Sequence, residues 1–217
     1  MRIYFLPAKI RALAFDMDLT LYTNPEYGQY QIDSLVERLG ELRGLSFEEM
    51  SREVEKTRKA LADSQGRKST SLSNVLAVFG IDTEEVVSWR EEIFQPERFI
   101  KEDLKLKATL EELSQSFVLG VVTNNPVLVA RKTLNALGVG ECFSILVGLD
   151  TCMVSKPHEM PFLKFSELSG CPLESCVSIG DRYEVDIDIP LRLGMGGILV
   201  DGVQDVYCLP PVLTLKL

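Results

Sequence analysis

Two aspartates, Asp16 and Asp18, follow a short apolar run that begins at Ile10. A nearly continuous apolar run of this length is typical of a strand buried on both faces of a parallel sheet. Open α/β sheets bind their ligands at the C-terminal ends of such strands, and two unneutralised carboxylates there would repel each other and resist desolvation. The pattern therefore predicts a bound cation and a reaction centre.

Polar side chains also follow the other apolar runs of the sequence. In chain order, the polar residues at predicted strand ends are Asp16, Asp18, Thr20, Thr123, Asn124, Lys156, Asp181 and Asp186. Because the C-terminal ends of parallel strands share one edge of the sheet, we expect these groups to converge on one crevice. Carboxylates, a lysine, hydroxyls and backbone amides are the groups that phosphoryl transfer needs, since that reaction depends on positioning and charge stabilisation.

Each acidic residue can be given a role in such a reaction. Asp16 is the candidate nucleophile, because aspartate can form an aspartyl phosphate that water then hydrolyses. Asp18, two residues along and on the same side, would protonate the leaving oxygen and later accept a proton from water. Hard oxygen ligands favour Mg²⁺, which we assign to Asp16, the backbone carbonyl of Asp18, and Asp181. Asp186 is expected to support the site rather than to ligate the metal.

The remaining strand-end groups would bind the phosphate. Lys156 would offset the charge shared between the nucleophile and the phosphate. Thr123, the backbone amide of Asn124 and the hydroxyl of Thr20 would hold phosphate oxygens.

Strand and helix patterns alternate along most of the chain. Five runs are predicted as buried strands: residues 10–15, 117–122, 143–147, 176–179 and 197–200. Helices are predicted for residues 104–113, 126–137, 159–168 and 184–193. Pro126 would take the first helical position after an Asn125 cap. This alternation predicts right-handed βαβ units, and so an α/β fold with a parallel sheet covered on both faces.

Residues 24–95 have a different pattern, with helical periods and no strand signal. After a predicted turn at residues 23–26, helices are expected at 31–42, 46–63, 72–79 and 82–94. Ser46 and Glu49 form a capping-box signature for the second of these helices. Because each helix needs a partner for its apolar stripe, the four should pack as a small bundle. We therefore predict one α/β domain, residues 1–23 and 96–217, interrupted by a helical domain at 24–95.

Composition excludes several classes of function. The net charge of −9 argues against nucleic acid as the main partner, because phosphate backbones are bound by basic patches. The apolar start, residues 1–7, is interrupted by Lys9 and Arg11 before any adequate signal sequence, and no later stretch approaches a membrane span. Five cysteines without zinc-type spacing indicate reduced thiols in a cytoplasmic protein, although Cys171 and Cys176 could pair under oxidation.

Taken together, the strand-end motifs resemble the four motifs of the haloacid dehalogenase superfamily. The resemblance rests on Asp16-x-Asp18-x-Thr20, Thr123, Lys156, and Gly180-Asp181 followed by Asp186. It implies a Rossmann-like core, a helical cap of the type called C1, and Mg²⁺-dependent phosphatase chemistry with the roles given above. Three residues depart from the usual pattern: Leu19, where Gly, Asn or Ser is commoner, Val185, and Pro190, which should kink or shorten its helix.

The resemblance leaves several reactions open. Dehalogenases of the superfamily lack the second aspartate, so Asp18 favours hydrolysis of a small phosphate monoester, such as a nucleotide, phosphoglycolate or a sugar phosphate. A capped sugar phosphomutase and a non-catalytic binding or regulatory protein of the same fold are the alternatives, and a phospho-accepting receiver domain is disfavoured by the long helical insertion. The oligomeric state is not predicted. Other side chains could contact a substrate or serve only capping, hinge or packing roles: Tyr22, Asn24, Tyr27, Arg67, Lys68 and His158.

Overall fold

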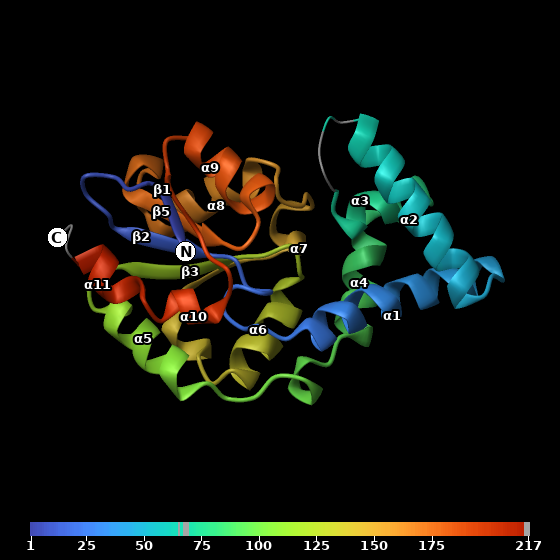
Figure 1. Ribbon diagram of the computed structural model, residues 1–217, viewed down its shortest axis with the longest axis horizontal. Coiled ribbons are helices and arrows are strands. Elements are labelled where there is room, and N and C mark those ends of the chain that lie inside the picture. Colours follow the sequence, from blue (N-terminus) through green and yellow to red (C-terminus); the bar gives the residue numbers. More distant parts are fainter. Residues whose placement is uncertain (65, 67–69, 215–217) are drawn as a thin grey trace.

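A computed structural model of the chain describes residues 1–64, 66 and 70–214 (Figure 1). Its centre is a six-stranded sheet with the strand order β1-β6-β5-β2-β3-β4. The strands are β1 (Arg2–Phe5), β2 (Ala12–Phe15), β3 (Val118–Val122), β4 (Ile145–Val147), β5 (Cys176–Gly180) and β6 (Gly196–Leu199). From β4 to β6, all neighbouring strands are parallel. The predicted α/β fold is confirmed.

The edge strand β1 was not predicted. It pairs antiparallel with β6, with Arg2 opposite Leu199. Its side chains are largely exposed, including Ile3 and Phe5. An edge strand lacks the fully buried apolar run that marks the central strands. The pairing partner of β1 is also almost two hundred residues away, so no local pattern reveals it.

Helices cover both faces of the sheet (Figure 1). One face packs on α5 (Leu104–Ser114), α6 (Val127–Ala136), α10 (Val203–Val206) and α11 (Leu209–Thr214), and the other on α8 (Met160–Ser169) and α9 (Asp188–Arg192). Within β2, Leu13 and Phe15 belong to the hydrophobic cluster that contains side chains of α5, whereas Ala12 and Ala14 belong to the cluster that contains side chains of α8. Successive side chains of a strand point to opposite faces, so this short run is buried on both sides.

Residues 24–95 are called the helical insert here, and their described part lies to one side of the sheet (Figure 1). The insert contains α1 (Pro25–Arg43), α2 (Phe47–Ser64), α3 (Leu72–Val78) and α4 (Thr83–Ile93). The capping box at the start of α2 is present, with Ser46 N–H donating to Glu49 Oε2 at 3.0 Å and Glu49 N–H to Ser46 Oγ at 3.3 Å. The apolar stripes form a separate cluster that includes the single tryptophan, Trp89, and reaches Val129 and Leu149 outside the insert.

Three helix boundaries differ from the sequence predictions. α1 begins at Pro25 rather than after a turn, because the Asn24 side chain caps it by accepting from the Tyr27 N–H. Pro126 is the N-cap residue of α6 rather than its first residue, and Asp150 accepts from the Val127 N–H. The predicted helix at 184–193 is a π-helical turn, η4 (Tyr183–Ile187), followed by the five-residue α9 with Pro190 inside it.

Short elements complete the chain. They are η1 (Pro96–Arg98), η2 (Gly140–Cys142), α7 (Leu149–Cys152) and η3 (Leu173–Ser175). The two connections between the insert and the rest of the chain are tied together, since Asn24 Nδ2 donates to the Phe99 carbonyl at 2.8 Å. Tyr27 and Tyr30 pack against Phe99 at the same place, with ring centroids 5.3 and 4.7 Å away.

Candidate active site

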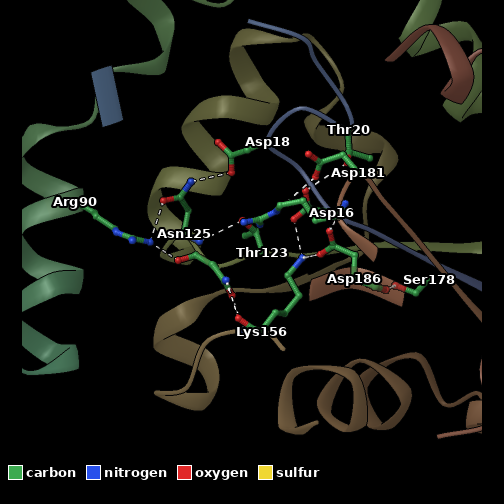
Figure 2. Close-up of polar contacts among 12 residues, drawn as sticks. Asp16, Asp18, Thr20, Arg90, Thr123, Asn125, Lys156, Ser178, Asp181 and Asp186 are labelled. Atoms are coloured by element: carbon green, nitrogen blue, oxygen red, sulfur yellow. Dashed lines mark hydrogen bonds and ion pairs between the residues drawn. The ribbon is translucent and has the colours of Figure 1, made fainter. Parts of the chain in front are cut away.

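The ends of β2 and β5 bring three carboxylates around one buried lysine (Figure 2). Lys156 Nζ lies 2.6 Å from Asp16 Oδ1 and 2.6 Å from Asp186 Oδ1, and all three side chains are buried. Burial alone would lower the pKa of Lys156, but the charges of Asp16 and Asp186 raise it above its usual value. The lysine therefore carries a fixed positive charge between the two carboxylates.

Asp16, Asp181 and Asp186 each place a carboxylate oxygen within 4.8 Å of the others. Within the described part of the chain, the buried Oδ1 of Asp181 has no hydrogen-bond partner, and its ion pair with Arg182 Nε is 3.7 Å long. Burial, together with the charges of Asp16 and Asp186, raises the pKa of Asp181 to about 7. Three clustered carboxylates, one of them lacking a donor, match the oxygen donor set of a hard divalent cation.

Backbone packing at the end of β5 fixes Asp186. The Arg182 N–H donates to Asp186 Oδ2 at 3.1 Å, and Ser178 Oγ donates to the Asp186 carbonyl at 2.7 Å. A Cβ at Gly180 would lie only 2.4 Å from that of Asp186, so only glycine allows this approach. Asp186 is thus a buried partner of Lys156 as well as a member of the acidic cluster.

The Asp18 carboxylate turns away from this cluster toward Asn125 (Figure 2). It accepts three hydrogen bonds: from Tyr22 Oη at 2.5 Å, Gln31 Nε2 at 2.8 Å and Asn125 Nδ2 at 2.9 Å. Asp16, in contrast, accepts from Thr20 Oγ1 at 3.3 Å. The structure therefore brings Asp16 and Thr20 together as expected but holds Asp18 in a separate network.

The loop after β3 is bonded to the loop that carries Lys156. Asn124 Nδ2 donates to the Lys156 carbonyl at 3.1 Å, and the Lys156 N–H donates to Asn124 Oδ1 at 2.7 Å. Thr123 is buried, and its Oγ1 accepts from the Asn125 N–H at 3.1 Å. The Asn124 side chain thus positions the lysine, a role that its place at a strand end did not reveal.

With this geometry in view, comparison with known proteins decides the family. The model of the family described as "Haloacid dehalogenase-like hydrolase" matches residues 13–200, most of the chain. The chain belongs to the haloacid dehalogenase-like hydrolase family. The resemblance inferred from the strand-end motifs is confirmed.

Three similar proteins show how far this likeness extends. A phosphoglycolate phosphatase from Pectobacterium atrosepticum is 30% identical over 122 residues, which cover 48% of this chain and 52% of the relative. The match thus spans about half the length of that relative. Two solved structures share the fold with TM-scores of 0.58: the putative hydrolase YfnB from Bacillus subtilis, described as bound to magnesium (18% identity, 94% of this chain and 99% of that one), and a 2-haloacid dehalogenase from Pseudomonas syringae (21% identity, 96% and 100%).

Sequence reasoning missed one buried cation, Arg90 of α4. Arg90 donates from Nη1 to the Asn124 carbonyl and to Asn125 Oδ1, and from Nη2 to Ser73 Oγ. Burial lowers the pKa of Arg90 to about 10, partly offset by the charge of Asp18. The sequence does hold a signal for this burial. Arg90 lies four positions after Val86 and four before Phe94, which places it on the apolar face of its helix.

A cavity of about 230 Å³ lies between the insert and the strand ends. Its polar lining includes Asp18, Gln31, Arg90, Asn125, Asp181 and Arg182. Ile32, Leu35, Leu72 and Phe94 supply apolar walls from the insert side. The cavity therefore joins the Asp18 network to the acidic cluster.

The remaining candidate residues have structural contacts. Tyr22 binds Asp18, whereas Asn24 and Tyr27 lie at the connections between insert and sheet. The exposed His158 accepts from the Met160 N–H at 3.1 Å, a local contact near the start of α8. Arg67 and Lys68 lie outside the described residues.

All five cysteines are free thiols in the structure. In the described part of the chain, no helix is both long and apolar enough to cross a membrane.

Proposed function

We propose that the protein is a phosphatase that hydrolyses a small phosphate monoester through an aspartyl phosphate on Asp16. The observation that carries this proposal is the buried Lys156 between Asp16 and Asp186, beside the unpartnered carboxylate oxygen of Asp181. The family membership and the phosphatase named among its relatives support it. The shared fold alone does not choose the reaction, since a dehalogenase has it too.

In the proposed reaction, Asp16 attacks the phosphorus atom and the bond to the leaving oxygen breaks. Asp18 gives its proton to that oxygen, so the leaving group departs as a neutral alcohol. A water molecule then attacks the aspartyl phosphate, Asp18 takes its proton, and inorganic phosphate and free Asp16 result. Lys156 stays protonated throughout and stabilises negative charge beside Asp16.

We propose Mg²⁺ as the cofactor, held by Asp16 and Asp181 with the backbone carbonyl of Asp18 as a third protein ligand. When bound, a divalent cation neutralises charge on the phosphate oxygens. The acidic cluster includes Asp186 in place of that carbonyl, but Lys156 and the Arg182 N–H already occupy both oxygens of Asp186. Asp16 also binds Lys156, but its second oxygen accepts a long bond from the Thr20 hydroxyl, 3.3 Å, whereas that of Asp186 is bound by a backbone N–H, so we retain Asp186 as a supporting residue. Thr123, Thr20 and the Asn124 amide stay our assignment for the phosphate oxygens.

We further propose that the chain divides into an α/β core domain, residues 1–23 and 96–217, and a cap domain of the C1 type, residues 24–95. The separate hydrophobic cluster of the insert and the cavity between insert and strand ends support this division. Because the core handles only the phosphoryl group, the insert should select the substrate, a small phosphorylated metabolite. A cytoplasmic location stays a prediction from the cysteine content.

Hydrolysis of p-nitrophenyl phosphate by the purified protein tests the mechanism. We expect turnover with Mg²⁺, none with EDTA, and none for Asp16→Asn, whereas Asp188→Asn, which only removes a helix-surface pair with Arg192, should keep wild-type turnover. Mg²⁺ should also raise the melting temperature of the wild type but not of Asp181→Asn. Turnover that survives Asp16→Asn would refute the nucleophile.

A metabolite panel then tests the substrate class. 2-Phosphoglycolate, nucleoside monophosphates and hexose phosphates should be compared by phosphate release and by product identity. Preferential release of phosphate from one class would support a phosphatase and name its substrate. Conversion of a hexose phosphate into its isomer without phosphate release would instead establish the phosphomutase alternative.

A further inference from the structure

The carboxylate of Asp18 is held by donors from three separate segments. Tyr22 belongs to the same loop, Gln31 to α1 of the insert, and Asn125 to the loop after β3. Oδ1 accepts from Tyr22 and Gln31, whereas Oδ2 accepts from Asn125. A carboxylate can otherwise rotate about its terminal torsion, because that torsion has a broad energy profile. These three bonds restrict it to one orientation.

Asn125 can orient Asp18 only if its own amide group faces the right way. Its Nδ2 donates to Asp18 Oδ2 and to Gln31 Oε1, the latter at 3.0 Å, while its Oδ1 accepts from Arg90 at 3.3 Å (Figure 2). Flipping the amide would place an oxygen against the Asp18 carboxylate and an NH₂ group against a guanidinium, which has no acceptor. Arg90 therefore selects the amide orientation that presents a donor to Asp18.

Burying the charged Arg90 costs desolvation free energy, and contacts within the insert do not compensate for it. Its exposed fraction is 7%, and its Nε has no hydrogen-bond partner among the residues that the structure describes. No carboxylate of the described chain forms an ion pair with it within 4.0 Å. A buried charge normally needs such a partner or good hydrogen bonds, and two of the three acceptors of Arg90 belong to Asn124 and Asn125. Its bonds are thus directed at the loop that contacts Asp18.

We infer that Asn125 and Arg90 are positioning residues, which hold the Asp18 carboxylate in the orientation needed for proton transfer to the leaving group. The inference rests on the proposed phosphatase function. Because Arg90 and Gln31 both belong to the insert, Asp18 is fully oriented only while the insert lies against the strand ends. A closed insert would thus orient Asp18 as the acid that protonates the leaving group, in addition to covering the cavity.

This role makes a prediction that a purely structural role does not. An ester with a strongly basic leaving group depends on protonation of that group, whereas p-nitrophenolate leaves without it. Benzyl phosphate and p-nitrophenyl phosphate are similar in size but differ in leaving-group basicity. The ratio kcat/KM reports the steps up to departure of the leaving group, so it is independent of the later attack by water.

The test is kcat/KM of the Mg²⁺-loaded protein on p-nitrophenyl, phenyl and benzyl phosphate. For Asn125→Ala, benzyl phosphate should lose about tenfold to a hundredfold in kcat/KM, and p-nitrophenyl phosphate distinctly less, because a misplaced catalytic group forfeits part of its contribution. Arg90→Lys, which keeps the charge but only a single donor nitrogen, and Gln31→Ala should show the same selectivity in weaker form. Asp18→Asn, which removes the proposed acid itself, sets the largest loss in kcat/KM that these variants should reach.

A matched control and two outcomes separate the explanations. Arg38→Ala removes an exposed arginine from the same insert and should leave all three esters unaffected. Equal losses on the three esters for folded Asn125→Ala and Gln31→Ala, with folding checked by circular dichroism, would overturn the positioning role while leaving the phosphatase intact. No hydrolysis of any ester by the wild type would overturn the proposed function itself, and this inference with it.

Discussion

At the scale of single residues, the loop after β2 has an unusual backbone conformation. Leu19, directly after Asp18, has φ of 61°, in the left-handed region that usually favours glycine. A side chain with a Cβ is strained there because the Cβ approaches the following carbonyl oxygen. Leu19 departs from the family motif, and the consequence of this departure is strain in the backbone. The Leu19 side chain also lines the cavity beside Asp18.

Leu19→Gly should relieve this strain. We expect the free energy of unfolding, measured by urea denaturation, to rise by about 1 kcal/mol. Met153→Gly should also stabilise, since Met153 has φ of 56° and lies elsewhere in the fold. Leu42→Gly is the matched control, because Leu42 is exposed in the helix α1 and glycine should destabilise it there. A loss of stability in Leu19→Gly as large as that in Leu42→Gly would contradict the assignment of strain.

At the scale of secondary-structure elements, one side chain both starts α1 and joins the two connections of the insert. Asn24 Oδ1 accepts from the Tyr27 N–H at 3.0 Å, and its Nδ2 donates to the Phe99 carbonyl. Tyr27 and Tyr30 pack on the Phe99 ring beside it. The position of the insert thus depends on a helix cap as well as on apolar packing.

Asn24→Ala should therefore destabilise the protein more than loss of an ordinary cap. Asp82 caps α4 by accepting from the Glu85 N–H and supplies the comparison. We expect Asp82→Ala to cost about 1 kcal/mol. Asn24→Ala should cost about 2 kcal/mol, because the hydrogen bond to Phe99 is lost as well. Chemical denaturation monitored by circular dichroism measures both, and equal costs would show that the bond to Phe99 contributes nothing.

These elements also show what sequence reasoning can reach. The central strands and the four insert helices could be predicted because apolar runs, helical periods and caps such as Ser46 are local signals. The edge strand β1 could not, since its pairing with β6 joins distant segments. The same limit applies to the site: the order of the strand-end motifs brought Asp16, Lys156 and Asp181 together, but the contact of Arg90 with Asn125 arises only in the folded chain.

At the scale of the whole molecule, the insert covers the site and contacts the strand ends on more than one side. Besides Arg90, Ser71 at the start of α3 meets Ser155, next to Lys156, with their Oγ atoms 3.1 Å apart. The cavity with Asp18 and Asp181 lies under this arrangement. If the protein acts on a substrate here as proposed, we expect its entry to require the insert to separate from the strand ends, as lids do.

A disulfide across this contact tests that requirement. In Ser71→Cys with Ser155→Cys, the two side chains are close enough for a bond to form under oxidation, and p-nitrophenyl phosphate turnover should fall and recover on reduction. Ser71→Cys alone, which also loses the cap of α3, should respond to neither treatment. Full turnover by the oxidised double variant, with the bond verified by mass spectrometry, would show that the insert need not open.

The place of the single tryptophan gives the molecule an optical reporter of its own. Trp89 is buried in the hydrophobic cluster of the insert and directly precedes Arg90 in α4. Tryptophan emission shifts to longer wavelength when water reaches the ring, so the native chain, without any attached dye, should signal movements at this helix. Stopped-flow fluorescence during substrate binding would then time the motion of the insert separately from the chemical step.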